Sequence, residues 1–132
     1  MSSSTATTRG IRVSVDARFS AEHSAPERQH WFFLYTIKIE NTGDLTVQLQ
    51  TRHWVITDGD GRVEEVRGPG VVGEQPTLSP GVIFRYTSGA PLRTPSGIML
   101  GWYQMTSKGG ENFDVVIPPF SLDSPYALHR VN

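Results

Sequence analysis

Apolar and polar residues alternate along much of this chain, and the alternation limits the fold more than any other feature of the sequence. Apolar residues occupy the odd positions from Ile11 to Phe19, with polar or charged residues between them. The same phase returns from Trp31 to Ile39, where the intervening positions are apolar at first and charged near the end. Because successive side chains of a β-strand point to opposite faces, both stretches are predicted to be strands with a buried face.

Turn-forming sequences separate these stretches from others of the same kind. Residues 41–44, 58–61 and 108–111 read Asn-Thr-Gly-Asp, Asp-Gly-Asp-Gly and Lys-Gly-Gly-Glu, and each is typical of a tight turn that closes a hairpin. Further strands are expected around these turns, at residues 45–56, 62–66, 82–86, 96–107 and 113–117. Together with the first two stretches, they predict about seven short strands.

The phase of the alternation changes inside one of these strands. The apolar residues from Leu45 to Leu49 occupy odd positions, whereas Trp54 and Ile56 occupy even positions. One extra residue in the strand, or a switch of the strand from one sheet to the other, would bring both sets to a buried face. We therefore expect a β-bulge or a sheet switch at residues 51–53.

Glycine and proline account for 13 and 9 of the 132 residues, and their positions argue against long helices. Residues 67–81 alone contain four glycines and three prolines, so this segment is expected to be a loop. The predicted fold is all-β: an antiparallel β-sandwich of about seven strands, of the fibronectin type III or immunoglobulin-like type. The chain has no cysteine for the immunoglobulin disulfide, so fibronectin type III-like is the better description, and a small barrel is the alternative.

The length suits a single domain with short tails. Residues 1–8 are mostly Ser and Thr and are expected to be a disordered tail, residues 9–126 to form the sandwich, and residues 127–132 to be a C-terminal tail. The sequence shows no secretory signal and no apolar run long enough to span a bilayer. The net charge of −1 gives no basic surface for nucleic acid. We expect a cytoplasmic protein with no membrane insertion and no nucleic-acid partner.

Residues 68–73 match the GxGxxG spacing that lets a backbone approach a phosphate group. In a dinucleotide-binding fold this loop opens a helix, but Pro76 and Pro80 block a helix here, and no strand–helix–strand unit surrounds the motif. Three interpretations stay open: glycines that let the chain turn, a loop that binds a protein partner, or a nest of amides that holds an anion beside Arg67. The candidate anion- or partner-binding residues are Arg67, Gly68, Gly70, Gly73 and Gln75.

No other residues form a recognisable metal-binding or catalytic pattern. The four histidines, which are too irregularly spaced for a sequence-encoded zinc site, are His23, His30, His53 and His129. The segment that starts at Asp58 is no calcium loop, because its twelfth position is Pro69 where a glutamate is required. A serine elbow, a P-loop lysine and a cysteine nucleophile are all missing. We expect no enzymatic activity, no metal and no cofactor.

Two aromatic positions lie out of phase with the apolar faces of their strands. Phe32 alternates opposite to the main apolar face, and Tyr103 alternates out of phase with Trp102. Core packing is the expected role of such residues, because both faces of a sandwich strand can be partly covered. Surface exposure would instead mark a partner surface, since Trp, Tyr and Arg dominate binding hot spots.

Several short motifs resemble the ApaG family and occur in order over residues 9–126. They are Glu40–Gly43, Arg52–Trp54, Thr57–Asp58, Val63–Val66, Gly68–Pro76, Tyr86–Gly89, Pro91–Leu92, Thr94–Pro95, Tyr103–Met105 and Ile117–Leu122. The resemblance implies a fibronectin type III-like sandwich, usually a stand-alone bacterial protein. The same domain is appended to eukaryotic F-box adaptors and to a polymerase-delta-interacting protein, contexts in which it looks like a protein-interaction module.

The resemblance also links the family to two metabolic settings without fixing an activity. Bacterial genes of the family often lie beside one for a diadenosine tetraphosphatase, and the alternative family name CorD refers to cobalt resistance and magnesium efflux. Our first hypothesis is a non-enzymatic module that binds an unidentified protein partner through the glycine loop. The second is a sensor that binds a small phosphate compound, such as a dinucleoside polyphosphate, at the same loop. A monomer or a weak homodimer is expected in either case.

Overall fold

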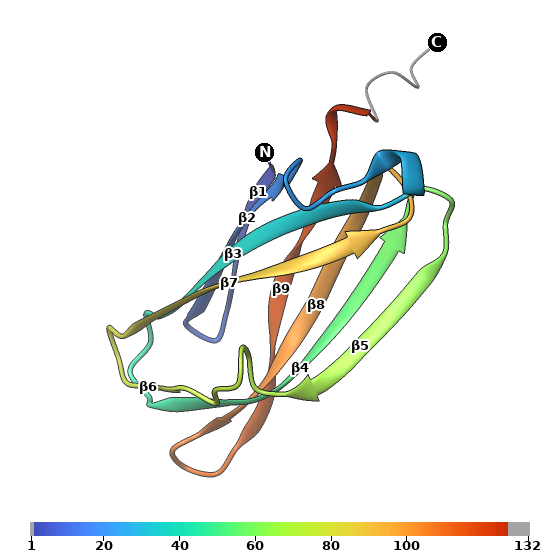
Figure 1. The fold of residues 1–132 in the computed structure, drawn as a ribbon. Coiled ribbons are helices and arrows are strands. Elements are labelled where there is room, and N and C mark those ends of the chain that lie inside the picture. Colours follow the sequence, from blue (N-terminus) through green and yellow to red (C-terminus); the bar gives the residue numbers. More distant parts are fainter. Residues whose placement is uncertain (1, 127–132) are drawn as a thin grey trace.

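Two antiparallel β-sheets packed face to face make up the fold in the computed structural model, which describes residues 2–126 (Figure 1). The first sheet contains, in spatial order, β1 (Ser2–Thr8), β2 (Ile11–Phe19), β3 (Trp31–Asn41) and β7 (Ile83–Leu92). The second contains, in spatial order, β5 (Val63–Pro69), β4 (Val47–Asp58), β8 (Ser96–Ser107) and β9 (Asn112–Asp123). A short strand, β6 (Thr77–Leu78), also pairs with β4.

The predicted all-β antiparallel sandwich is confirmed, with nine strands within residues 2–126 in place of about seven. The described residues contain a single-turn 3-10 helix, η1 (Pro26–Arg28), and no α-helix. No helix within residues 2–126 is long and apolar enough to cross a membrane. The expected C-terminal tail, residues 127–132, lies outside the described part of the chain, and the limits of the domain stay predictions.

The prediction of a disordered tail over residues 1–8 is wrong for Ser2–Thr8, which form β1. This strand pairs with β2 along its whole length, and the two-residue connection Arg9–Gly10 closes the hairpin. Both connecting residues have a positive φ, 49° at Arg9 and 83° at Gly10. A turn of this kind matches the twist of paired strands, and threonine suits a half-exposed strand. Turn geometry and β-propensity therefore order a segment whose hydrophobicity is low.

The segment 41–44, predicted to close a hairpin, instead carries the chain between sheets, because β3 and β4 belong to different sheets. The buried side chain of Asn41 holds this crossing together. Its Nδ2 atom donates to the carbonyls of Leu45 (2.8 Å) and Leu78 (2.9 Å), and its Oδ1 atom accepts from the Gly43 amide (2.9 Å). The other two predicted turns do close hairpins, between β4 and β5 and between β8 and β9.

The glycine- and proline-rich segment 67–81 is less loop-like than predicted. Strand β5 extends as far as Pro69, and Thr77–Leu78 form β6. Pairing with β4 supplies the backbone partners in both places, so tertiary context outweighs the local composition. The loop proper is reduced to residues 70–76.

The bulge predicted at residues 51–53 is present, one residue earlier than expected. The pairing of β4 with β8 steps from Leu49 to Thr51, which leaves Gln50 as the extra residue. As a result, Leu49 and Trp54 share the buried face of β4, although one has an odd and the other an even number.

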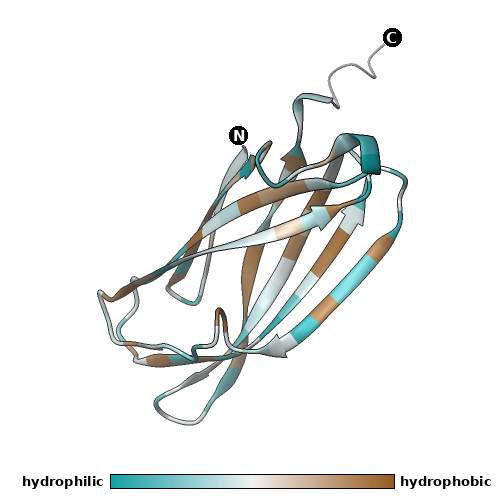
Figure 2. Cartoon of the chain, in the orientation of Figure 1, coloured by the Kyte–Doolittle hydropathy of each residue, from teal (hydrophilic) through white to brown (hydrophobic). Residues whose placement is uncertain are grey.

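The core lies between the two sheets and is built by alternating residues of the facing strands. Strand β3 shows this most regularly, since every odd-numbered residue from Trp31 to Asn41 is buried and every even-numbered one is partly exposed. Figure 2 shows the same alternation as hydrophobic and hydrophilic bands along the strands. The bulkiest fully buried side chains include Tyr103, Phe33, Ile11, Ile37, Ile39 and Leu49.

The sandwich is closed along one side and open along the other. Edge strands β1 and β9 lie against each other, and the Val116 amide donates to the Thr8 hydroxyl (3.2 Å). The hydroxyl oxygens of Ser2 and Ser121 lie 3.1 Å apart and are hydrogen-bonded along the same side. On the opposite side, no strand pairing joins the edge strands β5 and β7 in the described residues.

A hydrogen bond joins the two sheets across the core. The hydroxyls of Tyr86, on β7, and Tyr103, on β8, are bonded to each other, and both side chains are buried. Burial raises the pKa of both phenols, and of nearby Tyr35, because a phenolate would be desolvated there. The hydroxyls therefore stay protonated at neutral pH and form a polar link inside an apolar layer.

We expect the Tyr86–Tyr103 pair to show strong coupling in a double-mutant cycle. Tyr86→Phe leaves the fully buried Tyr103 hydroxyl without its partner, so it should cost about 1–3 kcal/mol of unfolding free energy. The double Phe variant removes both polar groups and should cost less than the sum of the single variants. Denaturant unfolding of the four proteins measures the coupling, and additive effects would contradict a mutual bond.

The raised pKa values also predict a pH dependence of stability. The folded chain holds the protons of Tyr35, Tyr86 and Tyr103 more tightly than the unfolded chain does. This stabilisation is complete below the ordinary tyrosine pKa of about 10 and is lost as the pH rises above it. The unfolding free energy should therefore fall above about pH 10. In the Tyr86→Phe/Tyr103→Phe variant, denaturant unfolding at a series of pH values should show a shallower fall.

Candidate functional site

The loop that follows β5 contains most of the predicted binding residues and folds back on itself as a small hairpin. The Val71 amide donates to the Glu74 carbonyl (2.8 Å), and the Glu74 amide donates to the Val71 carbonyl (2.9 Å). The two residues between them, Val72 and Gly73, have φ angles of 44° and 82°. Two such values in succession are typical of a type I′ turn. Glycine takes this conformation freely, whereas a β-branched valine is strained in it.

The bulge of β4 anchors this hairpin on both sides. The carbonyl of Gln50 accepts one hydrogen bond from the Gly70 amide and another from Nε2 of Gln75, both at 2.9 Å. Gly70 has a φ of 60°, and a Cβ at this position would overlap the carbonyl oxygen of Glu74. The extra residue thus supplies a carbonyl to the loop, and the missing side chain at position 70 lets the loop close.

Arg52 supports the loop from the inner side of β4. Its Nη1 atom donates to the carbonyls of Pro69 and Gly70, both at 2.9 Å. Gly68 makes room for this side chain, because a Cβ at position 68 would lie 3.1 Å from both terminal guanidinium nitrogens. Arg52 is not among the residues selected from the sequence, although its even position puts it in phase with Trp54 and so points it inward.

The five residues selected from the sequence do not converge on one point. The amides of Gly70 and Val71 are engaged inside the protein, and the side chain of Gln75 is held by the bulge. Arg67 points to the outer face of β5, where its side chain is 71% exposed. The structure therefore brings Gly70 and Gln75 together at the bulge carbonyl, places Gly68 against Arg52, and points Arg67 outward. An anion nest built from these residues stays a prediction.

Arg67 belongs to a polar group on the outer face of the second sheet. Its Nη2 atom lies 3.4 Å from Oε1 of Glu65, and the same carboxylate oxygen lies 2.7 Å from Nε2 of His53. The His53 ring packs beside the indole of Trp102, with ring centroids 5.3 Å apart. Glu65 thus holds a guanidinium and an imidazole beside a large aromatic ring.

Apolar side chains adjoin Trp102 on two sides of this outer face, at Leu100 and Val116. Leu100 pairs with Val55 across β8 and β4, and Trp102 pairs with Val116 across β8 and β9. All four are at least partly exposed, whereas Gly101 and Tyr103 on the same strand are buried. Ile98 and Val63 lie farther along the same face, on either side of Thr57, and are 50% and 61% exposed. We refer to these six apolar residues as the outer patch: Val55, Val63, Ile98, Leu100, Trp102 and Val116.

The aromatic residues that alternate out of phase differ in their exposure. Tyr103 is fully buried, as expected of a core residue. Its neighbour Trp102 is partly exposed on the outer face. Phe32 is also partly exposed, on the outer face of the first sheet, where its ring contacts those of His23 and His30. The phase conflict at positions 102 and 103 is thus the sequence signal that points to the outer patch.

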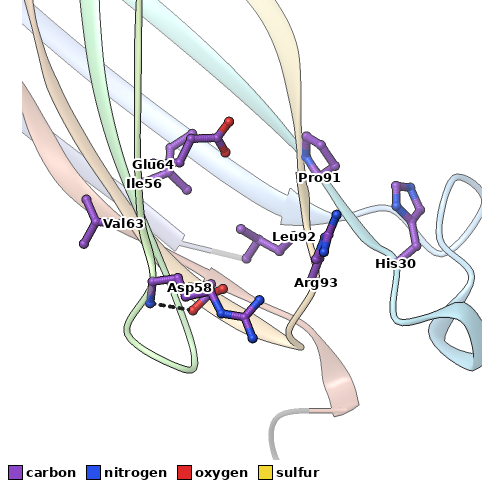
Figure 3. Close-up of a pocket in the computed structure, with 9 residues that line it drawn as sticks. His30, Ile56, Asp58, Val63, Glu64, Pro91, Leu92 and Arg93 are labelled. Carbon is purple, nitrogen blue, oxygen red and sulfur yellow. Dashed lines mark hydrogen bonds between the residues drawn. The ribbon is translucent and has the colours of Figure 1, made fainter.

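A cavity of about 470 Å³ lies at the end of the open side, between the turn after β4 and the end of β7 (Figure 3). Leu92 extends into it, and its charged lining residues are Asp58, Arg62, Glu64 and Arg93. The Asp58 carboxylate already accepts hydrogen bonds from the amides of Asp60 (2.9 Å) and Arg62 (3.0 Å). The two acidic and two basic side chains balance each other, and one of the acids already accepts hydrogen bonds from the turn. This cavity therefore favours no class of ligand.

Within residues 2–126, no group of three or more His, Cys, Asp or Glu side chains is placed to hold a metal ion. His23 is hydrogen-bonded to the Ser20 hydroxyl (2.7 Å) and His53 to Glu65. His129 lies outside the described residues. That the protein uses no metal and no cofactor stays a prediction.

Comparison with known proteins gives one consistent family. A family model described as the ApaG domain matches residues 21–107. Protein ApaG of Rhodospirillum centenum is 58% identical over 125 residues, which are 95% of this chain and 96% of the relative. Protein ApaG of Bradyrhizobium sp. (strain ORS 278) is 60% identical over 127 residues, 96% of this chain and 98% of the relative.

Solved structures agree with this result. A crystal structure of a Bordetella pertussis protein that carries the name ApaA matches with a TM-score of 0.85 and 50% identity, covering 87% of this chain and 94% of that chain. The C-terminal domain of wzt matches with a TM-score of 0.52 and 11% identity, covering 92% of this chain and 77% of that chain. The second likeness supports the fold alone.

The strained turn predicts a stabilising substitution. Asparagine tolerates the left-handed conformation better than valine, so Val72→Asn should raise the unfolding free energy by about 1 kcal/mol. Val63→Asn is the matched control, because Val63 is similarly exposed (61% against 55%) but lies in an ordinary strand conformation. Denaturant unfolding of both variants checks the prediction, and equal losses of stability would show that Val72 is not strained.

Proposed function

The chain belongs to the ApaG family, and we propose that it is a non-enzymatic binding module that recognises another protein through the outer patch and the adjacent Arg67. One observation carries this proposal: Trp102 is partly exposed beside Leu100 and Val116, at one end of the outer patch. Glu65, His53 and Arg67 supply polar groups along one side of that surface.

The composition of this surface matches that of protein interfaces. Such interfaces have an apolar centre and a polar rim, and Trp and Arg are enriched among the residues that contribute most of the binding energy. The contact between His53 and Trp102 holds the indole in place before any partner arrives. A rigid surface loses little conformational freedom on binding, so more of the contact energy appears as affinity.

The glycine loop contributes to this surface by fixing the edge of the sheet. Arg52 bonds to Pro69 at the end of β5, and the bulge carbonyl of Gln50 bonds to Gly70 just beyond it. These contacts hold the strand that presents Glu65 and Arg67 to the outside. In this proposal the loop is a support for the partner-binding surface, and Arg67 is the member of the motif that touches the partner.

A sensor of a phosphate compound, linked to diadenosine polyphosphate metabolism or to cation efflux, stays the alternative prediction. The amides of Gly70 and Val71 would have to leave their internal acceptors before they could hold a phosphate. A protein partner requires no such rearrangement, and for this reason we favour it.

Photo-crosslinking in cells that express the chain tests the proposal. A photoreactive amino acid at position 98, in the outer patch, should capture a partner protein. The same residue at position 83, on the first sheet, should not, and the two sites are matched because Ile98 and Ile83 are each 50% exposed. Trp102→Ala and Arg67→Ala should each weaken capture about tenfold or more. Arg85→Ala, which removes an exposed arginine from β7, should leave it unchanged.

Two results would contradict this proposal. Equal capture at positions 83 and 98 would mean that the outer patch is not the docking surface. Capture of a second copy of this chain alone, with a matching dimer in sedimentation, would mean that the patch serves self-association.

A further inference from the structure

A second cavity, of about 400 Å³, lies on the open side of the sandwich between the glycine loop and β7. Figure 1 shows the loop between β5 and β6 rising from the second sheet toward β7. Residues of both sheets form the inner part of the cavity, and the loop forms its outer wall. The volume lies within the range of about 300–1,000 Å³ that is usual for small-molecule sites.

The cavity contains a cation without a counter-ion. Arg52 is one of its lining residues, and none of the residues that line it is acidic. Among the described residues, no carboxylate lies within ion-pair distance of Arg52. Its Nη1 atom bonds to two loop carbonyls, while Nε and Nη2 have no hydrogen-bond partner within residues 2–126. These two nitrogens form the edge of the guanidinium that suits a bidentate anion.

Hydroxyl groups add further donors to the same cavity. The hydroxyls of Tyr86 and Tyr103 are bonded to each other, so one donates, the other accepts, and one O–H is left that this bond does not use. Tyr35 and Ser88, which also line the cavity, each bring a further hydroxyl. Burial keeps the phenols protonated, as their raised pKa values indicate, so these groups remain donors at neutral pH.

The charge and the hydrogen-bonding groups of this cavity indicate the class of ligand that it suits. The one formal charge among the lining side chains is positive, and their other polar groups are O–H and N–H donors of tyrosine, serine and tryptophan. A ligand that only accepts hydrogen bonds and carries negative charge meets both conditions. The side chains of Val71 and Val72 in the outer wall offer apolar contact to the rest of such a molecule.

We propose that this cavity binds a small organic anion, whose carboxylate or phosphate group accepts hydrogen bonds from Arg52 and the tyrosine hydroxyls while its apolar part contacts the loop valines. The site is separate from the outer patch. Arg52 and His53 are neighbours in β4, and neighbouring residues of a strand point to opposite faces. The proposal therefore does not depend on the protein partner and can fail or succeed independently of it.

Titration of the intact chain with simple probes, followed by amide and indole NMR, tests the proposal. The probes are benzoate, phenyl phosphate, inorganic phosphate and, as a neutral analogue, benzyl alcohol. We expect saturable shifts of the Trp54 indole and of the amides of Gly70, Gly73 and Ser88 with benzoate or phenyl phosphate. Benzyl alcohol should cause none at the same millimolar concentrations. The organic anion that binds more tightly identifies the preferred head group. Saturable shifts with inorganic phosphate but with neither organic anion would mean that the ligand needs no apolar part.

Two matched variants locate the site. Arg52→Gln should weaken binding of the organic anion by about tenfold or more, because it removes the charge and the free edge of the guanidinium. Arg85→Gln removes the same charge from the exposed face of β7, next to Tyr86, and should bind like the unaltered chain. Tyr86→Phe keeps Arg52 and the ring, so its binding should weaken several-fold even if Arg52→Gln disturbs the loop.

The proposal is overturned by any of three outcomes. They are equal shifts with benzoate and benzyl alcohol, unchanged binding by both Arg52→Gln and Tyr86→Phe, and the absence of saturable shifts at the Trp54 indole with every anion. None of these outcomes bears on crosslinking at the outer patch, so the two proposals are judged separately.

Discussion

The single extra residue in β4 determines the arrangement of everything around it. Without the bulge, the alternation that buries Leu49 would continue unbroken, which would turn Trp54 and Arg52 outward and bring His53 into the core. With it, an aromatic residue fills the core, a guanidinium reaches the glycine loop and an imidazole meets Trp102 on the outside. Gln50, the extra residue of the bulge, also provides the carbonyl that holds the loop. A β-bulge here does two things at once, since it changes the phase of a strand and frees a hydrogen-bonding group.

This geometry gives β4 two chemically different faces. Its outer face contributes Val55 to the outer patch and His53 to the polar group that Glu65 holds together. The inner face presents Arg52 to a cavity whose other polar groups are mostly hydroxyls. The loop links the two, because Arg52 bonds to Pro69, the last residue of β5, and β5 also carries Arg67.

Much of the fold could be predicted from local pattern, because a buried sheet face imposes its period on the sequence. The strand from Ser96 to Ser107 and the bulge near residue 51 follow from alternation alone. Longer-range choices could not be predicted. Asn41–Asp44 has the composition of a hairpin turn, yet it joins two sheets, since that outcome depends on which strands pair later in the chain. Strand β1 could not be predicted because pairing with β2, rather than its own hydrophobicity, orders it.

The candidate site shows the same division between pattern and tertiary structure. The glycine spacing is present, but each glycine is required for a different steric reason. Gly68 leaves space for Arg52, and Gly70 avoids an overlap with the Glu74 carbonyl. Gly73 takes a left-handed turn conformation. None of these demands involves a phosphate, so a motif defined by spacing alone cannot distinguish them from a nucleotide loop. The more informative signal was the phase of β4. Because Trp54 is buried, Arg52 must point to the same side of the strand. A cation in an inward position needs hydrogen-bond acceptors, which either the chain or a ligand has to supply.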